Sequence, residues 1–331
     1  MSESRTRSDG RTVHRIEFEV DWPPGHVACY VLTGSEPVVV DAGMPTDDDS
    51  DHDREATFRD GLARVGLEPT DVDHLLITHP HVDHVGQVPT LLEAADPTVH
   101  VPAGVEERFA RDVDALSERV RVNATSVGLT GGQLESAVEM ATESLRRDSQ
   151  LLPADRVDHW VVPDETFGLG AHELHAVHAP GHQADHLCYE LELDGENALL
   201  AGDMAMEPFR GVAIHDGLDD GVSEAFDAFY GALDRLSELD VDRLYPGHGA
   251  VHEEFHAVLD RDRGSLDRRL DGVLEALESG VRTVPGVAVS IAGERPVRYI
   301  LPEAYSALEH LQQVGRATVT VEDGVRYYDP V

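Results

Sequence analysis

The sequence predicts an α/β fold, and three observations point to it. Short apolar runs of strand length alternate with longer segments of helical spacing. Several of these apolar runs end directly at a histidine or an aspartate, which places polar side chains at one edge of a predicted sheet. The chain has 331 residues, of which 41% are hydrophobic, so it is long enough for one large domain and a small one.

The first part of the chain predicts strands that end at polar turns. Val27 to Leu32 and Pro37 to Val40 are apolar runs separated by the turn-like Thr33-Gly34-Ser35, which predicts a hairpin. Val72 to Thr78 predicts a further strand, and the apolar spacing of Val88 to Ala95 predicts a helix after it. The alternation of strands and helices is the pattern of an α/β domain.

Helical spacing then dominates a long stretch, from Gly104 to Leu152. Gly128, Gly131 and Gly132 divide it into two amphipathic halves, so we expect a helical hairpin inserted into the main domain at about residues 104–152. Two roles are open for this insertion. It either covers the core, as most amphipathic helices do, or forms a wall or lid over the active site.

The pattern changes again near residue 256. Asp260 to Leu277 and Pro302 to Val314 predict helices, and Glu322-Asp323-Gly324 predicts a tight turn between two short strands. Helices followed by a small hairpin are typical of a winged-helix module. We therefore predict a catalytic domain over residues 1–255 and a winged-helix-like domain over residues 256–331.

The charge of the chain is extreme. It has 64 Asp and Glu residues against 26 basic ones, all of them Arg, and a formal net charge of -38. Because the acidity is spread along the whole chain, it indicates halophilic adaptation to molar salt rather than a surface for a cationic partner. The absence of lysine excludes a Walker phosphate loop, a Ser-x-x-Lys nucleophile and Schiff-base chemistry.

The distribution of apolar residues predicts a protein away from membranes. No apolar run approaches the roughly 20 residues needed to cross a bilayer, and Met1 to Arg11 is polar, unlike a secretion signal. We expect a cytoplasmic location with no membrane partner. Cys29 and Cys188 each lie in an apolar, strand-like run, so we expect two buried free thiols.

One loop concentrates metal-binding side chains. The segment Thr78 to His84 follows a predicted strand and contains His79, His81, Asp83 and His84. Three histidines and a carboxylate in such a tight loop cannot all be core residues. Alternation places His79 and His81 on one side, while Asp83 and His84 can turn to another, which suits two adjacent metal ions better than one.

Four other segments place a His or an Asp just after an apolar run. These residues are Asp41, His182, Asp203 and His248, and each lies next to glycines or prolines that permit a sharp turn at the end of a strand. Strand ends at one edge of a packed sheet can bring ligands together from distant parts of a sequence.

His79-x-His81-x-Asp83-His84, followed by His182, Asp203 and His248 and preceded by Asp41, resembles the metallo-β-lactamase superfamily over roughly residues 13–252. The resemblance implies an αββα sandwich and two metal ions. His79, His81 and His182 would hold the first ion, Asp83, His84 and His248 the second, and Asp203 would bridge both. Asp41 would orient ligands from behind, and His186 would take a structural or supporting role.

Within the superfamily, the chain is similar to the glyoxalase II branch of thioester hydrolases. Its C-terminal part is similar to the winged-helix tail of the lactamase-beta-like proteins, which either packs beside the active site or mediates a homodimer. The cofactors implied are two zinc ions, with iron or manganese as alternatives.

The resemblance implies hydrolysis of a small-molecule thioester or related ester by a hydroxide held between two metal ions, with Asp83 and Asp203 as the catalytic carboxylates. Two alternatives remain open at this stage. One is a metal-dependent endoribonuclease, because two metal ions serve a phosphodiester equally well and the acidic surface argues against a nucleic acid only weakly. The other is an oxidoreductase with one iron, similar to persulfide dioxygenases.

Overall fold

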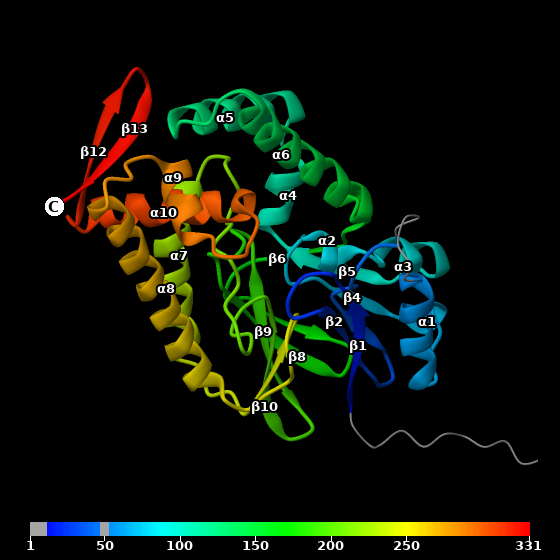
Figure 1. Cartoon of the computed structure of the whole chain (residues 1–331). Helices are drawn as coiled ribbons and strands as arrows, with labels where there is room; N and C mark the ends of the chain where they lie inside the picture. Colours follow the sequence, from blue (N-terminus) through cyan, green and yellow to red (C-terminus); the bar gives the residue numbers. More distant parts are fainter. Residues whose placement is uncertain (1–11, 47–52) are drawn as a thin grey trace, which may run out of the picture.

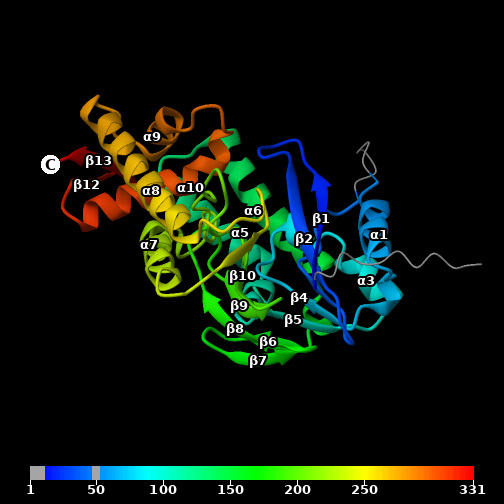
Figure 2. The same cartoon turned by 90° about the horizontal axis from the view of Figure 1, so that it is seen from below.

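The computed structural model describes residues 12–46 and 53–331, in which two β-sheets pack face to face between outer helices (Figures 1 and 2). The polar N-terminal segment, on which the expected cytoplasmic location partly rests, lies outside the described residues. The layers, from one side of the molecule to the other, are helix, sheet, sheet and helix, as predicted for an αββα sandwich.

The first half of the chain forms a six-stranded sheet in the order β1-β2-β3-β4-β5-β6. The first three strands are antiparallel neighbours, and the pairs from β3 to β6 are parallel. The short β3 and β4 are almost wholly buried and apolar, as parallel strands covered on both faces must be. The strands are β1 (Val13–Glu19), β2 (His26–Leu32), β3 (Val38–Val40), β4 (His74–Leu76), β5 (Thr98–Pro102) and β6 (His159–Val161).

The second half forms a five-stranded sheet in the order β11-β10-β9-β8-β7. Hairpin neighbours from β7 to β10 are antiparallel, whereas β10 and β11 are parallel. Strands β8, β10 and β11 therefore run in one direction. The strands are β7 (Thr166–Leu169), β8 (His172–His178), β9 (Leu187–Leu193), β10 (Glu196–Gly202) and β11 (Arg243–Pro246).

Apolar side chains fill the space between the sheets. Tyr30, Leu76 and Tyr189 are buried in this layer, and burial of a tyrosine requires a partner for its hydroxyl. The Tyr30 hydroxyl donates to the carbonyl of Pro246 at 2.7 Å, and the Tyr189 hydroxyl donates to that of Ile77 at 2.8 Å. Both bonds join backbone segments next to the candidate site, so the inner core also fixes that edge of the sandwich.

Helices cover the outer face of each sheet. Phe58 and Leu62 of α1 (Arg54–Arg64) and Leu91 of α3 (Val88–Ala94) pack on the six-stranded sheet. Phe226 and Phe229 of α7 (Ala225–Leu236) pack on the five-stranded sheet. The predicted helix after the histidine-rich loop is confirmed as α3, and a single turn, α2 (Val82–Val85), precedes it.

The stretch predicted to be helical, residues 104–152, consists of α4 (Gly104–Phe109), α5 (Val113–Ser126) and α6 (Gly131–Leu151). Helices α5 and α6 lie side by side at one end of the sandwich, close to the C-terminal helices (Figure 1). Gly128 lies in the connection and Gly131 is the first residue of α6, and both adopt positive φ, so these two predicted glycines mark the break, whereas Gly132 lies inside α6.

The C-terminal part contains α8 (Phe255–Glu278), α9 (Val284–Ile291), α10 (Val297–Gln313) and the hairpin of β12 (Ala317–Glu322) and β13 (Val325–Pro330). The predicted start of the last helix at Pro302 is wrong, because α10 begins at Val297 and includes the proline. Buried residues of α8, α9 and α10 share one core with α7. The helices and hairpin were expected, while the winged-helix assignment stays a prediction.

Two further expectations can be compared with the structure. Cys29 and Cys188 are buried free thiols, as predicted, and burial raises the pKa of both. Over residues 12–46 and 53–331, no helix is both long enough and apolar enough to span a membrane.

Candidate metal centre

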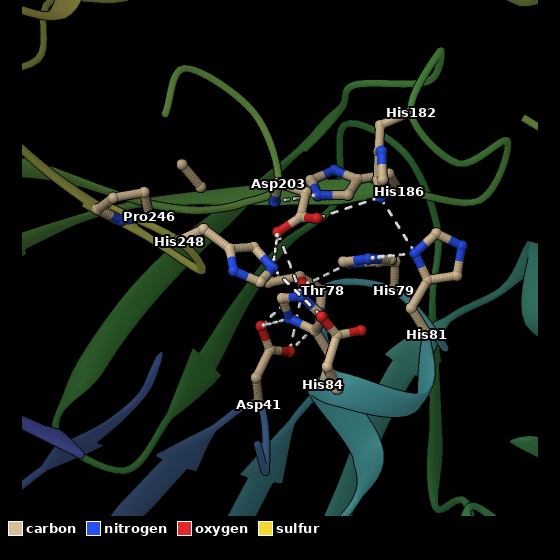
Figure 3. Close-up of polar contacts among 12 residues, drawn as sticks. Asp41, Thr78, His79, His81, His84, His182, His186, Asp203, Pro246 and His248 are labelled. Carbon is tan, nitrogen blue, oxygen red and sulfur yellow. Dashed lines mark hydrogen bonds and ion pairs between the residues drawn. The ribbon is translucent and has the colours of Figure 1, made fainter. Parts of the chain in front are cut away.

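The predicted ligands meet where five strands end. Asp41 directly follows β3, and the histidine-rich loop follows β4 in the same sheet. His182, Asp203 and His248 lie just after β8, β10 and β11, which run in one direction in the other sheet. The carboxyl ends of these strands open at the same edge of the sandwich, and Figure 3 shows Asp41 together with six of the seven predicted ligands there. The seventh, Asp83, lies with His84 and His248.

The potential ligand atoms form three overlapping groups, each with its atoms within 4.8 Å of one another. One group contains His79, His81 and His182, and another contains Asp83, His84 and His248. The third group, His79, His84 and Asp203, joins the other two. This arrangement is a pair of adjacent sites with a carboxylate between them.

The carboxylate of Asp203 faces both groups. Its Oδ2 lies 3.1 Å from Nε2 of His182, and its Oδ1 lies 3.2 Å from Nε2 of His84 and 3.6 Å from Nε2 of His248. One carboxylate can therefore offer one oxygen to each side. The backbone N–H of Asp203 donates to Nε2 of His186 at 3.1 Å, and this bond holds the start of the loop after β10 in place.

A second layer of contacts fixes which nitrogen faces the centre in four of the five predicted histidine ligands. Nδ1 of His182 lies 2.9 Å from the carbonyl oxygen of Val212, and Nδ1 of His248 lies 2.9 Å from that of His26. A carbonyl can only accept a hydrogen bond, so both Nδ1 atoms must carry the proton. Nε2 of each ring then points to the centre with a free lone pair, the form that binds a metal.

Asp41 and Thr78 fix two more rings, those of His84 and His79, in the same way. Nδ1 of His84 lies 2.8 Å from Oδ2 of Asp41, which confirms that Asp41 stands behind a predicted ligand. The Thr78 hydroxyl donates to the Asp41 carboxylate and therefore accepts from Nδ1 of His79, at 3.0 Å. Asp41 adopts a left-handed backbone (φ 56°), which an aspartate tolerates better than most residues do.

The free ring nitrogens are crowded in a way that a cation would relieve. Nδ1 of His81 lies 3.0 Å from Nε2 of His79 and 3.0 Å from Nε2 of His182. Nitrogens bound at about 2.0–2.1 Å to one zinc ion would be about 3–3.4 Å apart. Nε2 of His84 and Oδ1 of Asp203 are buried, and neither atom has a hydrogen-bond partner of good geometry among the described residues. The donor set therefore fits two metal ions.

The electrostatics of the centre fit the same conclusion. Burial, reinforced by neighbouring imidazoles, lowers the pKa of His79 and His81 well below the ordinary value, so both are neutral ligands at pH 7. Burial opposes ionisation of Asp203, yet the surrounding histidines hold the pKa of its carboxyl well below the usual range. Burial opposes protonation of His84 and His248 as well, yet Asp203 and the neighbouring carboxylates raise the pKa of both rings, so a metal ion bound there would take the place of a proton. Carboxylate and imidazole together are the ligands that zinc, iron and manganese bind.

His186 supports the centre, as expected. It is fully buried beside His79, and burial lowers its pKa to about 3, so the ring is neutral at pH 7. A neutral Nε2 can accept the bond from the Asp203 backbone. Close packing also fixes the last strand end, since a side chain at Gly247 would meet His84 and Asp203 within 3 Å.

Several supporting residues were not predicted. Thr78 and the carbonyls of Val212 and His26 orient histidine ligands, and a backbone carbonyl has no signal in a sequence. The segment after Asp203 is also held in place by a residue that is distant in the sequence. The carboxylate of Glu303 in α10 accepts from the N–H of Ala213 at 2.9 Å, next to Val212, and from Arg210 at 3.1 and 3.2 Å.

The αββα sandwich and the paired His and Asp groups define a class of metal-dependent hydrolases. Comparison with known families gives the same result: the model of the Metallo-beta-lactamase superfamily matches residues 22–248. The chain belongs to this superfamily. The ligands expected from the resemblance lie together in one place.

Individual relatives are more distant. The chain is 28% identical over 229 residues to a lactamase-like protein of Emericella nidulans, covering 68% of this chain and 51% of that protein. It is 26% identical over 208 residues to an atrochrysone carboxyl ACP thioesterase of Aspergillus fumigatus, covering 63% of this chain and 35% of that protein. The chain thus spans about half or less of the length of these two relatives.

A solved structure matches over almost the whole chain. The structure of a metallo-beta-lactamase family protein from Thermus thermophilus superposes with a TM-score of 0.75 at 21% sequence identity, covering 97% of this chain and 99% of that one. The similarity shows that the fold is shared, including the part of the chain after residue 248.

Proposed function

We propose that the protein is a binuclear metal-dependent hydrolase of thioesters or related esters, with chemistry similar to that of glyoxalase II. The position of Asp203 is the observation that supports this most, because its two oxygens face the two ligand groups separately. The name of the Aspergillus fumigatus relative, a thioesterase, supports the choice of a thioester over other substrates.

In this proposal each group of ligands holds one ion. His79, His81 and His182 hold the first, Asp83, His84 and His248 hold the second, and Asp203 belongs to both. Zinc is the metal we expect, since imidazole and carboxylate suit it, and iron or manganese would fit the same ligands. Bound there, two such ions supply a water-derived nucleophile at neutral pH and polarise the scissile carbonyl.

The residues around the ions have separate tasks. Asp83 is partly exposed, and its Oδ2 lies 3.2 Å from Nε2 of His248. Its carboxylate can therefore accept a hydrogen bond from the attacking water and orient it. Asp203, His79 and His84 are buried and exclude bulk water from the rear of the site. Asp41 keeps His84 in the tautomer that presents Nε2.

Hydrolysis of a panel of acyl thioesters by the metal-loaded protein, in molar potassium chloride, tests the proposal. We expect turnover of at least one acyl-thiol class by the wild type and none by Asp203→Ala. Turnover of RNA without turnover of any thioester would instead identify an endoribonuclease. Oxygen uptake by a protein loaded with iron alone would identify an oxidoreductase.

A further inference from the structure

We infer that the acyl group of the substrate is long or bulky and apolar, and that it binds in a cavity beside the metal centre between α6, residues 214–219 and the start of α10. The inference rests on the proposed function, because it assigns a specificity to the same site. It concerns the acyl side of the thioester and leaves the thiol carrier open.

The cavity begins at the candidate metal centre. It has a volume of about 850 Å³, within the roughly 300–1,000 Å³ of small-molecule sites, and His81 and Asp83 form part of its lining. From there it extends below α6 to Val297 and Leu301 of α10. A substrate whose carbonyl lies at the metal centre can therefore extend its acyl group into the cavity.

Much of the lining is apolar and incompletely covered. Side chains from four separate parts of the chain contribute to it, and each keeps part of its surface exposed in the free protein. These half-buried residues are Phe109, Ala137, Met140, Ala141, Ile214 and Val297. Covering such a surface with an apolar ligand is favourable in proportion to the apolar area that becomes buried. A short polar acyl group would leave this surface in contact with water.

The cations in the lining are mostly already paired. Arg108 donates to Asp185 at 2.7 Å and also pairs with Asp216, and Arg111 lies 3.1 Å from Asp219. These ion pairs hold residues 216–219 against α4, so this wall of the cavity is built from neutralised charge. At this wall, an acyl group with a carboxylate would have to displace one of these pairs, whereas an apolar group would not.

The main test is a chain-length series of thioesters on one small carrier, N-acetylcysteamine, with acetyl, hexanoyl, octanoyl and decanoyl groups. For the metal-loaded protein we expect kcat/KM to rise by up to about fourfold for each CH₂ group that becomes buried. A series that is flat or falls with length would overturn the inference and leave the proposed hydrolase standing.

A binding measurement separates the two proposals. The matching S-alkyl thioethers of N-acetylcysteamine have no carbonyl and cannot be hydrolysed, so calorimetry on the full chain reports the cavity alone. We expect Kd to fall as the alkyl chain lengthens. Tight binding of the decyl thioether without hydrolysis of any thioester would refute the proposed function only, while equal Kd values across the series would refute the cavity assignment.

A variant locates the effect in the cavity. Ala141→Phe should fill the space under α6 and lower the ratio of decanoyl to acetyl turnover at least tenfold. The matched control is Ala115→Phe, on the exposed side of α5 and away from the cavity, which should leave the ratio unchanged. An unchanged ratio in a folded Ala141→Phe protein would contradict the inference. If that variant does not fold, the thioether series decides.

Discussion

Two buried polar clusters of this molecule differ in how their charges are satisfied. In the Glu303 cluster, formed by Arg210, Ala213, Arg269 and Glu303, the central carboxylate is matched by its neighbours. It receives two bonds from Arg210 and one from the backbone of Ala213, and it lies 2.6 Å from Arg269. In the metal centre, by contrast, Nδ1 of His81 lies 3.0 Å from Nε2 of both His79 and His182, so a single proton on His81 is the most that these three ring nitrogens can share.

The difference shows how a ligand site can be told from a structural cluster. A buried carboxylate beside two guanidinium groups has its charge compensated, although Nε of Arg210 and Nε of Arg269 make no hydrogen bond of good geometry, and it holds α10 against the segment after Asp203. A set of lone pairs turned toward one point is unfavourable until a cation binds. Substitutions that remove one member of each cluster should therefore have different effects. In the metal centre the substitution should impair metal binding, and in the Glu303 cluster it should impair folding.

The largest effect is expected for Asp203→Ala. Because this carboxylate faces both ligand groups, its loss should remove metal and lower turnover by far more than the roughly 10–100-fold typical of outer contacts. Metal content and thioester hydrolysis measure both. Asp60→Ala, an exposed site on α1, is the control and should match the wild type. Normal metal content in Asp203→Ala would show that the carboxylate is not a ligand.

Glu303→Ala should act mainly on folding. It leaves Arg210 buried with no carboxylate opposite, which typically costs about 3–5 kcal/mol in the free energy of unfolding. Denaturant unfolding in molar salt is the measurement. A loss below about 1 kcal/mol would mean that the cluster contributes little to stability.

The Glu303 cluster should also respond to acid. Burial alone would raise the pKa of Glu303, but Arg210 and Arg269 hold it at about 2, against an ordinary value of about 4.5. The folded state therefore binds this proton less readily than the unfolded chain does. The resulting stability is fully present above about pH 4.5 and is lost as the pH falls toward about 2.

Comparison with Glu303→Gln isolates this contribution, because the metal ligands titrate in both proteins. The difference in unfolding free energy between wild type and variant should shrink as the pH falls from 6 to 2.5. A difference that stays constant over this range would show that the folded-state pKa of Glu303 is not depressed.

A smaller effect is expected behind the metal centre. Asp41→Asn keeps the shape of the side chain but removes the charge that orients His84, so metal affinity should fall by about 10–100-fold. Competition with a chelator measures it, and the fold should be retained by circular dichroism. An unchanged metal affinity would show that Asp41 contributes only to the structure of the strand end and not to the orientation of His84.

The smallest effect is expected on the surface. Arg121 and Glu135 form an exposed ion pair between α5 and α6. Glu135→Ala should leave the melting temperature within error, since exposed pairs are solvated and screened by salt. A clear drop would show that the pairing of α5 with α6 depends on surface charge.

The sequence was informative about the metal centre because its ligands have a local pattern. His79, His81, Asp83 and His84 lie within one loop, and the other ligands each follow an apolar run. Strand direction then decides that these ends meet, and in the second sheet β8 and β10 run in one direction because β9 lies antiparallel between them. Asp41 was placed near the site on the same basis, whereas His186 was expected there from the resemblance to the superfamily.

The Glu303 cluster could not be predicted in this way. Ala213 and Glu303 are 90 residues apart, and a glutamate on a helix normally faces solvent. The start of α10 was missed because a proline is usually found in the first turn of a helix, whereas Pro302 lies well inside α10. The cavity was also hidden, since its lining comes from segments that only tertiary packing brings together.

Anomalous diffraction from crystals of the metal-loaded protein tests the central claim most directly, because it locates each ion. We predict two peaks in the metal centre, one among His79, His81 and His182 and one among Asp83, His84 and His248, with Asp203 between them. A single peak, or ions bound only elsewhere, would contradict the binuclear site and the hydrolytic function built on it.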